Sequence, residues 1–112
     1  MTAQYKGRYR FFSDPGHGWL EVPRAEVVAS GAQISRYSYY DPHTDMAYLE
    51  EDCDQPAFLK AAGFMGPVPI DRMDSDMPRQ LPAYGADAIA NRRIFIDDHI
   101  LVVRPTGNGG LR

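Results

Sequence analysis

The sequence contains little cysteine and no long apolar segment. Cys53 is the only cysteine among 112 residues, which excludes an internal disulfide and a multi-cysteine zinc site. No apolar run reaches the roughly 18 residues that a membrane helix needs. The opening sequence, MTAQYKGRYRFF, lacks the apolar core of a signal peptide. These absences predict a cytoplasmic protein that does not associate with a membrane.

The length and composition are typical of one folded domain spanning 1–112. The chain is 44% hydrophobic and 24% charged, which argues against disorder, and its length leaves no room for a second full core. The net charge of -3 does not favour direct binding to nucleic acid. The charge is polarised, because positions 41–54 hold six acidic residues and no lysine or arginine, whereas Lys6, Arg8 and Arg10 make the N-terminal segment basic.

Two strand–turn–strand–helix units are predicted within 9–63. The first has β-favouring aromatic residues on either side of a turn-forming sequence, and a helix in which Val27 and Val28 face inward. Pro23 suits the start of that helix, and Gly31 suits its left-handed C-terminal cap. Its predicted elements are strands at 9–12 and 19–22, a turn at 13–18 and a helix at 24–30.

The second unit repeats this order of elements without repeating the residues. Alternation of side chains predicts its first strand, and Asp54 is expected to cap the helix through its carboxylate, with Gly63 ending it. Its predicted elements are strands at 34–39 and 46–49, a turn at 41–45 and a helix at 57–62.

The remaining sequence carries a weaker signal. The segment 64–82 contains four prolines and is predicted to be a long loop. Strands are expected within 93–104, followed by a mobile glycine-rich tail over 105–112. The predicted fold is therefore α+β, with a small antiparallel β-sheet, two short helices and a C-terminal β-hairpin.

Three segments carry a resemblance to a known group of proteins. They are SDPGHGWLEVP at 13–23, ISRYSYYD at 34–41 and AYLEEDCD at 47–54. In motif order and spacing they resemble a family of small uncharacterised bacterial proteins, some of which occur in phages and plasmids. The resemblance covers about the first 60 residues. It implies a bacterial or mobile-element setting and does not indicate a biochemical activity.

The densest cluster of candidate binding residues is acidic. Glu50, Glu51, Asp52 and Asp54 place four carboxylates within five residues. Such a cluster can present charge to a basic protein partner or bind a hard cation, although the spacing of an EF-hand is absent. The alternative is a solvated strand-to-helix turn, where the helix dipole favours acidic residues.

Tyrosine and arginine form a second candidate surface. Alternation would place Tyr37 and Tyr39 on one face of a strand, with Arg36 beside them. Tyrosine is enriched in protein interfaces. A stacking surface for single-stranded nucleic acid is also conceivable, but the acidic middle of the chain disfavours it, and packing in the core is the alternative.

His17 and Cys53 are the remaining chemical candidates. His17 lies between two glycines, where it can titrate near neutral pH or bind a metal, or simply belong to a turn. Cys53 precedes a predicted helix, but neighbouring carboxylates oppose formation of a thiolate, so we expect a buried structural thiol. His17, His43 and His99 show no zinc-binding spacing. We expect no metal and no cofactor.

No nucleophile, base and orienting partner occur at a recognisable spacing, so an enzyme is not expected. The prediction is a non-enzymatic module that binds a macromolecular protein partner. In a mobile-element setting, the most specific version of this prediction is an inhibitor of a host defence system, similar to an anti-CRISPR protein. Two alternatives stay open: a small metal- or histidine-dependent hydrolase using His17, His43 and the nearby carboxylates, and a homodimeric accessory protein.

Overall fold

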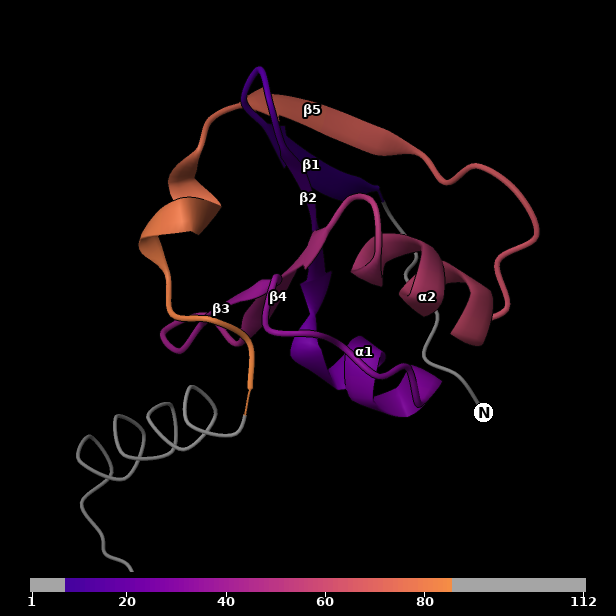
Figure 1. Cartoon of the computed structure of the whole chain (residues 1–112). Helices are drawn as coiled ribbons and strands as arrows, with labels where there is room; N and C mark the ends of the chain where they lie inside the picture. The colour runs from indigo at the N-terminus through magenta and orange to yellow at the C-terminus, as the bar shows by residue number, and fades with distance from the viewer. Residues whose placement is uncertain (1–7, 86–112) are drawn as a thin grey trace, which may run out of the picture.

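The computed structural model describes residues 8–85, which form five strands, two α-helices and one 3-10 helix. The strands make a single sheet in the order β3-β4-β2-β1-β5 (Figure 1). All neighbouring strands are antiparallel except β1 and β5, which are parallel. The elements in chain order are β1 (Tyr9–Ser13), β2 (Gly18–Pro23), α1 (Arg24–Ser30), β3 (Tyr39–Asp41), β4 (Met46–Glu50), α2 (Asp54–Ala61), β5 (Ile70–Asp74) and η1 (Met77–Gln80).

The α+β class is confirmed, but the sheet is mixed and not purely antiparallel. The difference comes from β5, which lies inside the segment predicted to be a proline-rich loop, 64–82. The prolines stop at Pro69 and resume at Pro78, so every residue of β5 keeps its backbone N–H for pairing with β1. Pro78 then occupies the first turn of η1, where its missing N–H costs nothing.

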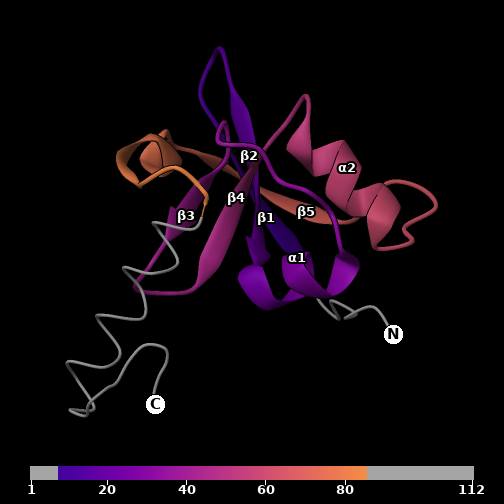
Figure 2. The ribbon, with the colours of Figure 1, turned by 60° about the horizontal axis from the view of Figure 1, so that its bottom comes forward.

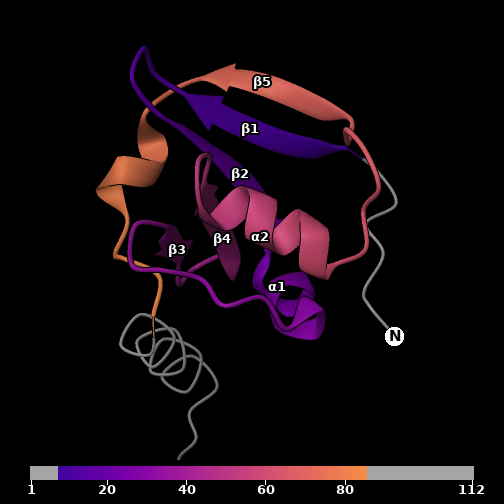
Figure 3. The same cartoon turned by 45° about the vertical axis from the view of Figure 1, so that its right-hand side comes forward.

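Successive side chains along a strand point to opposite faces of the sheet, and both faces of this sheet bear apolar residues. One face packs beneath α1 and α2, which lie side by side against it (Figure 3). The opposite face carries a smaller cluster of Phe12, Trp19 and Tyr48, which Met77 and Leu81 cover. Figure 2 shows α2 and η1 on opposite sides of the sheet. The segment around η1 therefore covers the second face of the sheet, and the sequence did not predict this second layer.

The first predicted unit is confirmed in its hairpin and its helix. Gly31 has a φ of 78° and its N–H donates to the Val28 carbonyl, which is the expected left-handed cap. The two valines of α1 differ, however. Val27 is buried, whereas Val28 is 59% exposed, because consecutive helical residues lie about 100° apart and only one of them can face the sheet.

The second unit differs from its prediction at the first strand. β3 begins only at Tyr39, so most of the predicted strand 34–39 is turn and coil. The cause is the carboxylate of Asp54, which accepts hydrogen bonds from the backbone N–H of Ser35 and from the hydroxyls of Ser35 and Ser38. Hydrogen bonds to the side chain of a residue distant in sequence replace the strand ladder here. Asp54 consequently caps no helix; it is the first residue of α2.

The predicted strands over 93–104 and the tail over 105–112 lie outside the described residues. Between residues 8 and 85, no helix is both long enough and apolar enough to cross a membrane.

Candidate functional site

A cavity of about 440 Å³ lies on the side of the sheet that faces η1. Its lining includes five residues that the sequence singled out for binding: His17, Tyr37, Tyr39, Glu50 and Asp52. Gly16, Trp19, Cys53 and Arg79 complete the lining. We call this cavity the Trp19 pocket. It unites a hairpin turn, a tyrosine-bearing segment, an acidic turn and η1, which are far apart in the sequence.

Strand register places the aromatic floor of the pocket beside its acidic wall. Trp19 of β2 pairs directly with Glu50 of β4, so the two side chains lie on the same face of the sheet. The ring of Tyr39, on neighbouring β3, meets the ring of Trp19 edge-on, with centroids 6.0 Å apart. Trp19 itself is only 2% exposed. It therefore supports the pocket from below.

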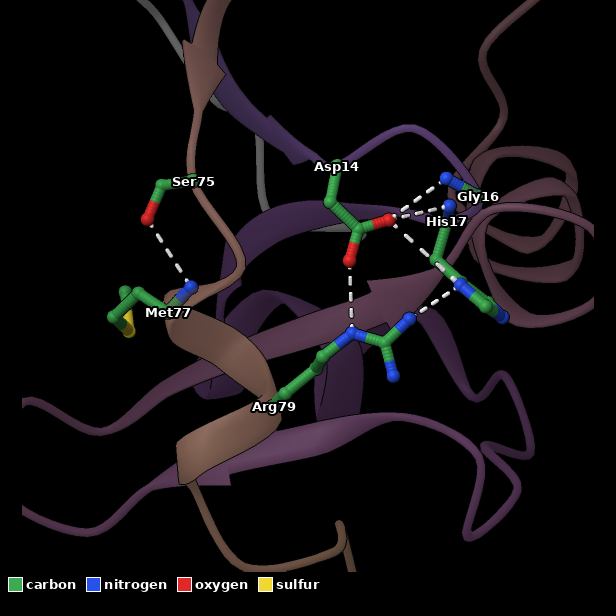
Figure 4. Close-up of polar contacts among 6 residues, drawn as sticks. All are labelled: Asp14, Gly16, His17, Ser75, Met77 and Arg79. Atoms are coloured by element: carbon green, nitrogen blue, oxygen red, sulfur yellow. Dashed lines mark hydrogen bonds and ion pairs between the residues drawn. The ribbon is translucent and has the colours of Figure 1, made fainter.

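The hairpin turn is held by Asp14. One carboxylate oxygen accepts hydrogen bonds from the backbone N–H groups of Gly16 at 2.9 Å and His17 at 2.8 Å. The other oxygen accepts from Nε of Arg79 at 2.9 Å (Figure 4). This contact with Arg79 is the main cause that lowers the pKa of the Asp14 carboxyl below its ordinary value. An ion pair thus fastens η1 to the β1–β2 turn.

His17 belongs to the same arrangement. Arg79 donates a second hydrogen bond, from Nη2 to Nδ1 of His17 (Figure 4). A guanidinium has no acceptor, so Nδ1 is unprotonated in this contact and the proton of a neutral ring is on Nε2. The imidazole also lies nearly parallel to the Trp19 ring, at a centroid distance of 6.1 Å, and Arg79 lies over the same indole at 5.2 Å. His17 is a fixed wall of the pocket.

The acidic wall is formed by the turn between β4 and α2. One oxygen of Glu50 accepts from the backbone N–H groups of Asp52 and Cys53, at 3.0 and 2.8 Å. Among residues 8–85, no ion pair joins Glu50, Glu51 or Asp52 to a basic side chain. Glu51 and Asp52 are exposed. The wall therefore carries negative charge that the described part of the protein does not neutralise.

Three of the candidate residues do not line the Trp19 pocket. Asp54 is buried, at 4% exposure, and its carboxylate is occupied by Ser35 and Ser38. Glu51 and Arg36 are exposed neighbours of pocket residues. The role of Asp54 is therefore to shape the acidic turn from inside, while Glu51 and Arg36 lie outside the cavity.

Cys53 is exposed, which contradicts the expectation of a buried structural thiol. The turn before α2 leaves its side chain at the pocket edge. Partial desolvation and the nearby Glu50 carboxylate raise the pKa of the Cys53 thiol. The thiol is therefore mainly protonated at neutral pH, which disfavours its use as a nucleophile. Over the range 8–85, no three His, Cys, Asp or Glu side chains are grouped so that they could hold a metal ion.

Arg79 and Trp19 are pocket residues that sequence reasoning missed. Trp19 was placed only in a predicted strand, 19–22, and Arg79 lies in the proline-rich segment that was predicted to be a loop. Only the pairing of β5 with β1 carries Arg79 to the hairpin, and no local pattern signals that pairing. Comparison of the chain with protein-family models, curated proteins and solved structures gives no match.

Proposed function

We propose that the protein is a non-enzymatic module that binds another protein through the Trp19 pocket and the adjoining acidic turn, Glu50–Asp52. The observation that carries this proposal is the combination of exposed aromatic surface with unneutralised carboxylates in one cavity. Aromatic rings supply contact area at low entropic cost, and charges at the rim steer and orient a complementary partner.

The partner that suits this surface is basic. Phosphate groups of nucleic acid would be repelled by the acidic turn, whereas a lysine- or arginine-rich protein surface would be attracted. Together with the mobile-element setting that the family resemblance implies, this favours an inhibitor of a host defence system, similar to an anti-CRISPR protein. In this role the acidic turn would occupy a basic groove that otherwise receives nucleic acid.

The hydrolase alternative has less support from the same pocket. Nδ1 of His17 already accepts a hydrogen bond from Arg79, and the raised pKa of Cys53 keeps its thiol protonated. A general base must reach the proton it removes, and a nucleophile must be activated. Neither requirement is supported by these contacts, so binding without catalysis is the preferred function.

A matched pair of variants tests the proposal. The double variant Glu51→Ala/Asp52→Ala removes two charges at the acidic turn, and Asp74→Ala/Asp76→Ala removes two charges at a separate cavity. In bacteria with active CRISPR interference, we expect wild type and the Asp74/Asp76 variant to restore transformation by a targeted plasmid, and the Glu51/Asp52 variant to fail.

The same three proteins serve as baits for affinity capture from those cells. A basic protein captured by wild type and by the Asp74/Asp76 variant, and lost with the Glu51/Asp52 variant, supports docking through the acidic turn. Equal capture by all three proteins would overturn it. Capture with the expected selectivity, but without restored transformation, would reject the inhibitor role and retain the binding module.

A further inference from the structure

We infer that the Trp19 pocket receives an arginine side chain of the protein partner. The inference deepens the proposed function and rests on it, because it names the group that the docking surface recognises. The pocket offers the two features that a guanidinium requires, which are aromatic faces for stacking and carboxylate oxygens for charged hydrogen bonds. Its volume of about 440 Å³ falls within the range of roughly 300–1,000 Å³ that is usual for ligand pockets.

The aromatic side of the pocket is available to a ligand. Tyr37 lines the cavity and is 70% exposed, so its ring is open to solvent. Tyr39 is partly buried and contacts Trp19 through its edge. A planar cation entering between Tyr37 and the acidic turn can therefore lie against a ring without displacing the packed core.

The carboxylate side is also available. One oxygen of Glu50 accepts two backbone N–H groups, and the Cys53 thiol is a further hydrogen-bonding neighbour of this carboxylate. The Asp52 carboxylate has no bonding partner among residues 8–85. Lys60 is the basic residue nearest in sequence, and neither Lys60 nor Arg36 lines the cavity. Two carboxylates thus line the pocket, and the arginine that lines it with them, Arg79, is ion-paired with Asp14 and not with either of them.

Arg79 shows how this pocket accommodates a guanidinium. Its side chain lies over the Trp19 indole at the hairpin side of the pocket. Figure 4 shows its hydrogen bonds to Asp14 and His17. Asp14 neutralises that charge, so Arg79 does not neutralise Glu50 and Asp52. A second guanidinium, opposite the first, would repeat the same pairing of ring and carboxylate at the acidic side.

Arginine fits these features better than lysine does. A guanidinium is planar, stacks on an aromatic face and presents a fork of N–H donors that matches carboxylate oxygens. The ammonium of lysine is more strongly hydrated and cannot stack. We therefore expect a preference for arginine of about tenfold, which corresponds to about 1.4 kcal/mol.

The experiment uses the whole protein and three small probes: N-acetyl-arginine amide, its lysine analogue and its uncharged citrulline analogue. Titrations are followed by two-dimensional ¹H–¹⁵N NMR, in which the indole N–H of Trp19 reports on the pocket and the dispersion of all signals reports on folding. We expect saturable shifts at Trp19, Tyr37 and Tyr39 with the arginine probe, weaker binding of the lysine probe and no binding of citrulline.

Variants locate the probe. Asp52→Ala is expected to weaken arginine binding by about three- to tenfold, since one charged hydrogen bond is lost, and Asp74→Ala is expected to leave it unchanged. Equal binding of citrulline, equal binding of lysine, an unchanged affinity in Asp52→Ala or no binding would each overturn the inference. If a partner is captured through the acidic turn while the arginine probe does not bind, the proposed function survives and the arginine ligand is rejected.

Discussion

Ser38 donates a hydrogen bond of 2.5 Å to the buried carboxylate of Asp54. The same hydroxyl oxygen accepts from the backbone N–H of Glu50 at 2.9 Å. Ser38 lies between Tyr37 and Tyr39, so this bond ties the tyrosine side of the Trp19 pocket to its acidic side. The first residue of α2 therefore determines the shape of a cavity that its own side chain does not line.

Removing that carboxylate should destabilise the protein. Asp54→Ala leaves the Ser35 N–H and the Ser38 hydroxyl without their acceptor, and unsatisfied buried groups cost about 1–3 kcal/mol. Asp52→Ala, two residues away and exposed, should change the free energy of unfolding by less than about 0.5 kcal/mol. Urea unfolding measures the free energy of unfolding of both variants. Similar losses in the two variants would contradict the structural role of Asp54.

Gly18 should not tolerate a side chain, whereas Gly16 should tolerate one. A Cβ at Gly18 would lie 2.4 Å from Cζ of Phe11, so the core must shift and we expect a loss of about 1–3 kcal/mol for Gly18→Ala. A Cβ at Gly16 would come no closer than 4.0 Å to Asp14. Neither glycine has a positive φ. Thermal unfolding of the two alanine variants should separate them clearly, and equal melting temperatures would count against the close approach at Phe11.

Glu26 should make stability depend on pH in an unusual direction. Burial raises the pKa of its carboxyl, and the hydrogen bond that Tyr9 donates at 2.8 Å opposes this only in part. Because the folded-state pKa exceeds the unfolded one, the folded protein binds the proton more tightly. The contribution of Glu26 to stability is therefore greatest below the unfolded pKa and falls as pH rises through the folded pKa.

Glu26→Gln removes this titration and keeps an oxygen that can accept from Tyr9. We expect the variant to be more stable than wild type at about pH 7 and nearly equal to it below about pH 4. Urea unfolding at several pH values measures the difference. A difference that stays constant over this range would show that Glu26 is not the titrating group.

The elements that the sequence predicted are those held by local interactions. The β1–β2 hairpin and the Gly31 cap follow from residues close together in the chain. The predicted strand 34–39 was wrong because Asp54, far along the sequence, competes for its hydrogen bonds. β5 was missed because a short strand of alternating charge among prolines carries no apolar pattern, and only its pairing with β1 reveals it.

The Trp19 pocket was likewise predictable only in those features that do not depend on long-range contacts. Residue chemistry was enough to select Tyr37, Tyr39, Glu50 and Asp52, which meet in one cavity. It was not enough to select Arg79, because an isolated arginine beside a proline gives no local signal of the carboxylate that it reaches. Candidate groups could be chosen from the sequence, but their juxtaposition depends on strand register and on η1.

The Arg79–Asp14 ion pair provides a pH-dependent test of that juxtaposition. Arg79 lowers the pKa of Asp14, so the folded-state pKa lies below the unfolded one. The stabilisation is present above the unfolded pKa and is lost as pH falls through the folded pKa. The stability difference between wild type and Arg79→Ala should therefore be larger at about pH 7 than at about pH 3.

Arg72→Ala is the matched control, since the Arg72 guanidinium lies over the Phe11 ring at 5.6 Å and forms no ion pair with a described carboxylate. The difference in the free energy of unfolding between wild type and Arg72→Ala should vary little with pH. Measuring both variants again in a His17→Ala background removes the imidazole, which is the second titratable partner of Arg79. If the stability losses caused by Arg79→Ala and Arg72→Ala then show the same pH dependence, the ion pair does not fasten η1 to the hairpin.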